Sequence, residues 1–167
     1  MLPKNYAYRM NCDRNFAPHI ENDICILSGC KKTTIEKWAN EGSWVIGIGG
    51  NNTGKPNKLI YAMKVEEKLK YPEFKKLYPN KSNYLQKEEA GDNVLLSRRF
   101  YYFGDEAIDL PEKKFNGIIV DRQGCKRIEN IDTLEEYIKG CGFESIGKLG
   151  EPNNSKLGCL TKKCKTE

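Results

Sequence analysis

Two runs of alternating hydrophobic and polar residues dominate the middle of the chain. The side chains that share a face are Trp44, Ile46 and Ile48 in the first run and Leu59, Tyr61, Met63 and Val65 in the second. Successive side chains of a strand point to opposite faces of a sheet, so this alternation predicts two strands. The residues between them, GGNNTGKPN at 49–57, are almost all turn formers. Residues 43–65 therefore predict a long β-hairpin with a flexible tip.

Shorter patterns of the same kind occur on both sides of the hairpin. The strand-like runs are 6–10, 25–27, 93–97, 99–103 and 117–120. Two other segments, 33–40 and 133–140, have apolar residues at the i, i+3, i+4 spacing of a helix face. A weaker helical pattern covers 71–78, where Pro72 suits a first helical turn. Strands and helices in this uneven order predict an α+β fold, a small mixed or antiparallel sheet or barrel with two main helices packed on it.

The length of 167 residues is enough for one domain with a substantial core. We assign residues 1–150 to a single globular α+β domain and 151–167 to a flexible basic C-terminal tail. No apolar run approaches the ~18 residues that span a bilayer, and the N-terminus lacks the apolar core of a signal peptide. We therefore expect a cytoplasmic protein with reduced thiols and no membrane partner.

The charge and the cysteines narrow the classes of ligand. A formal net charge of +5 suits a polyanion such as DNA or RNA, and it equally suits a solvated lysine-rich surface. The seven cysteines form no CxxC pair and accompany a single histidine, which argues against a structural zinc site. We expect no metal and no cofactor, and the oligomeric state is left open.

Three residues are candidates for catalysis. Cys30 lies beside Lys31 at the start of a predicted helix, where a positive field favours the reactive thiolate. Asp13 and Asp92 lie in loops between predicted strands, where they could converge for acid–base chemistry or could simply shape turns. The glycine-rich hairpin tip is not a phosphate-binding loop, because Lys55 is followed by Pro56 rather than by a helix that begins with Ser or Thr.

An aromatic run, Phe100-Tyr101-Tyr102-Phe103, follows two arginines. Aromatic rings can stack on unpaired bases while arginines hold phosphates, so the run suggests a nucleotide pocket. The alternative is that the same rings fill a core. The full set of candidate base- or nucleotide-binding residues is Tyr8, Phe16, Lys31, Trp44, Tyr61, Met63, Asn93, Arg98, Arg99, Phe100 and Tyr102.

The order of five short motifs resembles the second of the nucleotide modification associated domain families, from phages and bacteria. The motifs are YAYRMNCDRNFAP, SGCKKTTIEKWANEGSWVIGIGG, LIYAMKV, AGDNVLLSRRFYYFG and GKLGEPN, which together cover residues 5–152. The resemblance implies a role tied to modified bases in DNA. Where the family pattern has Gly-Asp-Trp, this chain has Gly42-Ser43-Trp44, which removes one carboxylate. The element order is also similar to that of PUA-like and EVE-like readers, which hold a flipped base in an aromatic cage.

These observations favour a protein that binds a nucleotide, a modified base or DNA. Two alternatives remain open. One is an enzyme acting on a base or nucleotide through Cys30 or through Asp13 and Asp92. The other is a structural or interaction protein of a mobile element, in which the aromatic residues only fill the core.

Overall fold

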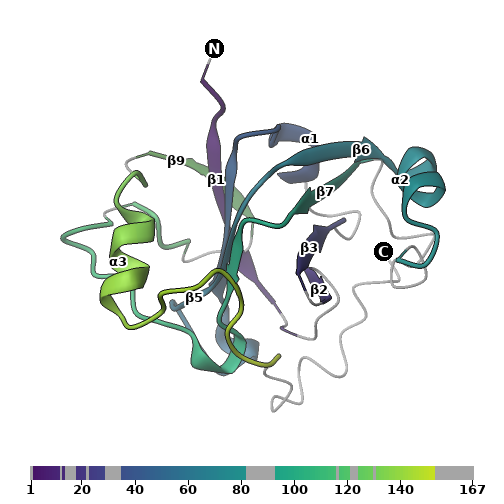
Figure 1. Ribbon diagram of the computed structural model, residues 1–167. Helices are drawn as coiled ribbons and strands as arrows, with labels where there is room; N and C mark the ends of the chain where they lie inside the picture. Colours follow the sequence, from purple (N-terminus) through teal and green to yellow (C-terminus); the bar gives the residue numbers. More distant parts are fainter. Residues whose placement is uncertain are drawn as a thin grey trace.

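Two β-sheets form the centre of the computed structural model, which describes residues 2–11, 13, 18–21, 23–28, 35–81, 93–115, 117–120, 124–129 and 131–152 (Figure 1). The six-stranded sheet has the order β10-β8-β5-β4-β1-β9. Its strands are β1 (Asn5–Met10), β4 (Trp44–Gly49), β5 (Leu59–Lys64), β8 (Phe100–Tyr102), β9 (Cys125–Ile128) and β10 (Gly147–Lys148).

The four-stranded sheet has the order β2-β3-β7-β6. Its strands are β2 (His19–Glu21), β3 (Ile24–Leu27), β6 (Glu67–Lys70) and β7 (Asn93–Ser97). The described helices are α1 (Ile35–Trp38), α2 (Tyr71–Leu77) and α3 (Leu134–Gly140), with 3-10 turns η1 (Asn51–Thr53) and η3 (Gly104–Glu106). The α+β class is confirmed, and the described strands form two open sheets rather than a closed barrel.

Three hydrophobic clusters separate the layers. The first lies between the sheets, because it joins Tyr8 and Tyr61 of the larger sheet to Cys25 and Leu27 of the smaller one. The second packs α3 on the outer face of the six-stranded sheet, and the third packs α2 on the outer face of the four-stranded sheet. Figure 1 shows α3 and α2 on opposite sides of the two sheets. The face of the larger sheet that carries Tyr8 is therefore enclosed by a second sheet.

The predicted hairpin is confirmed as the pair β4–β5, with Val45 opposite Met63. Its tip has a defined conformation, in which η1 is followed by Gly54 in the left-handed region and Thr53 is buried. The amide of Gly50 donates to the carbonyl of Met10 at 2.9 Å, so the tip is fixed to the end of β1.

The sequence prediction differs from the structure mainly in short elements. Strands β2, β6, β9 and β10 have at most four residues each, too few to show a period in the sequence. The run 117–120 is a turn and an extended segment rather than a strand. Helix α2, by contrast, confirms the weaker helical pattern expected at 71–78. Among the described residues, no helix is long and apolar enough to cross a lipid bilayer.

The boundary of the predicted tail is not tested. Glu151 is the first residue of that tail, and its carbonyl accepts from the amide of Asp105 at 2.7 Å. Residues 153–167 lie outside the described part of the chain, so the division at residue 150 stays a prediction.

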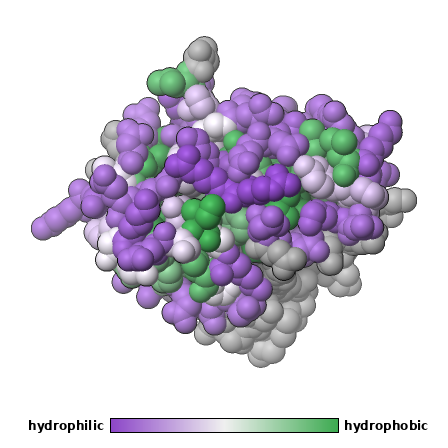
Figure 2. Space-filling view, in the orientation of Figure 1, coloured by the Kyte–Doolittle hydropathy of each residue, from purple (hydrophilic) through white to green (hydrophobic). Residues whose placement is uncertain are grey.

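The view in Figure 2 shows a mainly hydrophilic surface with small, separate hydrophobic areas.

Candidate functional site

A row of residues crosses four adjacent strands on the face between the two sheets. Tyr8 of β1 is paired with Gly47 of β4, Gly47 with Tyr61 of β5, and Tyr61 with Tyr102 of β8. The hydroxyl groups of Tyr8 and Tyr61 lie 2.7 Å apart and form a buried hydrogen bond. The row therefore brings three phenol groups together from segments far apart in the sequence.

Gly47 makes this contact possible. A Cβ atom at this position would lie 2.4 Å from the ring of Tyr61 and 2.6 Å from the sulfur of Met10, far closer than real contacts allow. Because β4 has no side chain here, the two tyrosines of the flanking strands reach each other across it. Their rings meet edge to face, with centroids 6.1 Å apart.

A buried carboxylate completes the row. Asp13 is only 1% exposed, and the hydroxyl of Tyr102 donates a hydrogen bond to its Oδ1. The two residues are 89 positions apart in the sequence. From the smaller sheet, Cys25 of β3 contacts Met63 of β5, with the two sulfur atoms 3.7 Å apart. Glu36 of α1 is also buried. We call Tyr8, Tyr61, Tyr102, Asp13, Cys25 and Glu36 the inter-sheet polar cluster.

Burial keeps the phenols and the thiol of this cluster protonated. Desolvation raises the pKa of Tyr8, Tyr61 and Tyr102 well above that of a free tyrosine, and the charge of Asp13 adds to the effect at Tyr102. Desolvation also raises the pKa of the Cys25 thiol. These groups therefore act as neutral hydrogen-bonding partners at physiological pH, and Cys25 is not an activated nucleophile.

The predicted pocket wall is divided between the two faces of the larger sheet. Tyr8, Tyr61, Met63, Phe100 and Tyr102 belong to the cluster between the sheets. Trp44 belongs to the opposite face, together with Tyr101 and Phe103. The physical reason is the register of the hairpin: Val45, not Trp44, is paired with Met63, so Trp44 points to the opposite face. The whole run 100–103 is at most 1% exposed, which favours the interpretation of these rings as core.

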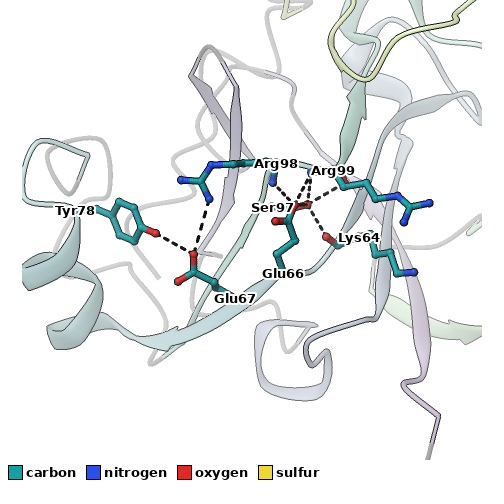
Figure 3. A network of polar contacts seen from close by, with 7 residues as sticks. All are labelled: Lys64, Glu66, Glu67, Tyr78, Ser97, Arg98 and Arg99. Carbon is teal, nitrogen blue, oxygen red and sulfur yellow. Dashed lines mark hydrogen bonds and ion pairs between the residues drawn. The ribbon is translucent and has the colours of Figure 1, made fainter.

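The two arginines predicted to hold phosphate are engaged by carboxylates. The guanidinium of Arg98 lies 4.0 Å from Glu67, which also accepts from Tyr78 at 3.0 Å (Figure 3). Arg99 forms an ion pair with Glu135 and lies over the ring of Trp44, 5.9 Å from its centroid. Both side chains remain about half exposed.

Of the remaining candidates, only Asn93 lies among the described residues, and it is not part of the inter-sheet cluster. Asn93 lies at the start of β7, where it is paired with Lys70 of the edge strand β6. Phe16, Cys30, Lys31 and Asp92 lie outside the described residues. Within the described residues, no group of three or more His, Cys, Asp or Glu side chains is arranged to hold a metal ion.

The sequence predictions did not include Cys25 and Glu36 as components of the cluster, nor Gly47 as the position that lets the tyrosines meet. Gly47 had a signal, because it and Gly49 are the two positions without a side chain in an otherwise hydrophobic strand. Glu36 had none, because a glutamate in the first turn of a helix is normally exposed and favoured by the helix dipole.

A comparison with protein-family models matches the chain to nucleotide modification associated domain 2 over residues 2–82 and 76–158. The two matched segments overlap and together span most of the sequence, including every described strand and helix. Comparisons with curated proteins and with solved structures gave no match. The likeness to PUA-like readers stays a resemblance in the order of elements.

Proposed function

Because the chain belongs to the nucleotide modification associated domain 2 family, we propose that it binds a nucleobase or nucleotide through its inter-sheet polar cluster. The family description associates the chain with nucleotide modification. Base binding, and DNA as the partner, are the finer steps of the proposal. The observation that carries it is the row Tyr8–Gly47–Tyr61–Tyr102 ending at Asp13.

A purely structural core gives little reason for such a row. Each buried hydroxyl or carboxylate costs free energy unless it is hydrogen-bonded, and a phenylalanine fills nearly the same volume without that cost. Here three hydroxyl groups and one carboxylate lie on a single face of one sheet. Polar groups gathered in this way are typical of sites that recognise a polar ligand.

The chemistry of the cluster suits the edge of a base. The carboxylate of Asp13 accepts hydrogen bonds, and base amino and imino groups donate them. A neutral tyrosine hydroxyl both donates and accepts, so it can pair with the carbonyl, ring nitrogen or hydroxyl groups of a base. Enzymes and readers that take a base out of the stack recognise it by hydrogen bonds to its edge together with stacking on aromatic rings.

Binding can be tested by titration calorimetry with deoxycytidine, 5-hydroxymethyldeoxycytidine and the other three deoxynucleosides. Tyr102→Phe removes a hydroxyl that we propose contacts the base and that also positions Asp13, so we expect affinity to fall by about tenfold, equivalent to about 1.4 kcal/mol. Tyr101→Phe is the matched control, since Tyr101 is the next residue, is equally buried and donates to a carboxylate, Glu135, on the opposite face.

The result that contradicts the proposal is a wild-type protein that binds none of the nucleosides, or equal losses in the two variants. Tyr8→Phe provides a second test at the other end of the row if Tyr102→Phe is poorly folded by circular dichroism. Equal thermal stability of the variant and the wild type would show that a loss of affinity is local.

Catalysis remains a second candidate because Asp13 is a buried carboxylate beside a phenol donor. An enzyme that acts on a base needs a general base of this kind within reach of the substrate. Asp13→Asn then abolishes turnover of a bound nucleotide while leaving its binding within a few fold. A binding protein instead loses affinity in the same variant and shows no product by mass spectrometry.

A further inference from the structure

The glycine- and asparagine-rich hairpin tip holds one arginine side chain in a fixed position. Arg9 is the second-last residue of β1, and its Nη1 donates to Asn57 Oδ1 at 2.7 Å and to the carbonyl of Val120 at 3.0 Å. Its Nη2 donates to Asn51 Oδ1 at 3.4 Å. All three acceptors are uncharged, so they orient the guanidinium without neutralising it.

The loop is built to make these contacts. Asn57 is the one described non-glycine residue with a positive φ, 63°, a conformation that asparagine tolerates better than most residues. A Cβ atom at Gly50 would lie 2.5 Å from the carbonyl of Met10, so only glycine lets the tip approach the end of β1 this closely.

A second cation, Lys126, lies on the same face of the larger sheet as Arg9. Lys126 of β9 is paired with Ala7, and strand alternation puts both Arg9 and Lys126 on the same face of the sheet as Ala7. The Nζ of Lys126 donates to the carbonyl of Ile119 at 2.8 Å, next to the carbonyl that Arg9 binds. Among the described residues, no carboxylate lies within 4.0 Å of either cation. Two like charges on one face of a sheet repel each other, and an anion bound between them would relieve that repulsion.

The guanidinium of Arg9 has donors left for that anion. Of its five N–H groups, the three bonds described use two on Nη1 and one on Nη2. The N–H of Nε and the second N–H of Nη2 remain, and arginine donors of this kind bind phosphate oxygens in pairs. The arrangement contrasts with Arg98 and Arg99, whose guanidinium groups already face carboxylates.

On the basis of the proposed function, we propose that Arg9 and Lys126 bind a backbone phosphate of the DNA strand that carries the bound base. Arg9 and Asp13 are four residues apart and therefore at most about 14 Å from each other at the Cα atoms. The phosphate site and the base site lie on opposite faces of the larger sheet, so the phosphate that Arg9 and Lys126 reach belongs to a neighbouring nucleotide and not to the one whose base is bound.

The experiment compares charge-removing variants in binding to a fluorescein-labelled 20-nucleotide single-stranded DNA, followed by anisotropy between 50 and 200 mM NaCl. Each lost phosphate contact reduces the slope of log K against log salt by about 0.7 on single strands. We expect this reduction for Arg9→Gln and for Lys126→Gln. Arg127→Gln is the control, because Arg127 is the next residue of β9, carries the same charge and lies 3.7 Å from Glu129.

An equal change of slope in all three variants, or no change in any, overturns the proposal. Arg9→Lys keeps the charge but loses the arrangement of hydrogen bonds to the loop. A salt slope near the wild-type value in Arg9→Lys would show that the change in Arg9→Gln comes from the charge and not from the loop contacts. A nucleoside and the single-stranded DNA then separate the two sites. Arg9→Gln should weaken binding of the DNA alone, whereas Tyr102→Phe should weaken binding of both. Nucleoside binding with unchanged DNA binding in Arg9→Gln and Lys126→Gln refutes only the phosphate site, and absence of all binding refutes the proposed function as well.

Discussion

Gly47 decides whether the row of tyrosines can form, and its replacement gives a test at the scale of one residue. Gly47→Ala puts a methyl group where the ring of Tyr61 and the sulfur of Met10 now lie, at 2.4 and 2.6 Å. Overpacking of a core by one carbon costs about 1–3 kcal/mol, so we expect the free energy of unfolding in urea to fall by that amount.

Gly140→Ala is the matched control for this substitution. Gly140 is the last residue of α3, and a Cβ atom there meets nothing within 4 Å. Alanine also favours the helix, so the free energy of unfolding should stay the same or rise by up to about 1 kcal/mol. A loss in Gly47→Ala no larger than the change in Gly140→Ala would contradict the role assigned to Gly47.

Single residues also show how far the sequence can predict the site. Alternation in the hairpin and the aromatic run correctly puts Tyr61 with Met63 and Phe100 with Tyr102, because the period of a strand is a local property. It cannot show that Asp13 meets Tyr102, since that contact joins loops and strands 89 residues apart. Trp44 was grouped with the wrong face because the register between two strands is set by pairing, which the sequence does not display.

At the scale of elements, two neighbouring chain segments pass from one sheet to the other at the same corner. Strand β5 of the larger sheet is followed in the chain by β6 of the smaller sheet. Strand β8 of the larger sheet is preceded by β7 of the smaller sheet. The carboxylate of Glu66 accepts from the amides of Arg98 and Arg99, at 2.7 and 2.8 Å, where both segments bend (Figure 3). Ser97 adds a hydrogen bond from its hydroxyl to the carbonyl of Lys64.

Replacement of Glu66 tests whether this corner stabilises the two-sheet arrangement. Glu66→Ala removes a charge-assisted acceptor from two amides, and we expect it to lower the free energy of unfolding by about 1–2 kcal/mol. Glu112→Ala removes the same charge from an exposed turn and should change it by less than about 0.5 kcal/mol. Equal effects on the urea midpoint would show that only net charge matters.

The short elements around that corner explain which parts of the fold escape prediction. The six-residue strands of the hairpin carry enough alternation to be identified, whereas β2, with three residues, is stabilised by its pairing with β3. Such elements form because a neighbour supplies hydrogen-bonding partners, and their own sequence contains little preference for the strand.

At the scale of the whole molecule, the buried tyrosines link stability to alkaline pH. Burial raises the pKa of Tyr8, Tyr61 and Tyr102, and burial with the nearby Glu135 raises that of Tyr101 to about 12. A tyrosine in the unfolded chain ionises near pH 10. Between pH 10 and 12 the native state therefore holds more protons than the unfolded state, and its stability falls as pH rises. Below pH 10 this contribution to stability is fully present.

The size of this pH dependence predicts that the protein unfolds cooperatively before its tyrosines titrate one by one. Each such tyrosine lowers stability by about 1.4 kcal/mol per pH unit once its unfolded form is ionised, so four together approach about 5 kcal/mol per unit. A domain has only about 5–15 kcal/mol of unfolding free energy in total, so unfolding should be complete within one to three pH units above pH 10.

Tyrosinate absorbance at 295 nm should then rise together with the loss of far-UV circular dichroism. Tyr101→Phe should make the pH dependence shallower by one proton. Full titration near pH 10 with the circular dichroism intact would show instead that water reaches the inter-sheet cluster in the folded protein.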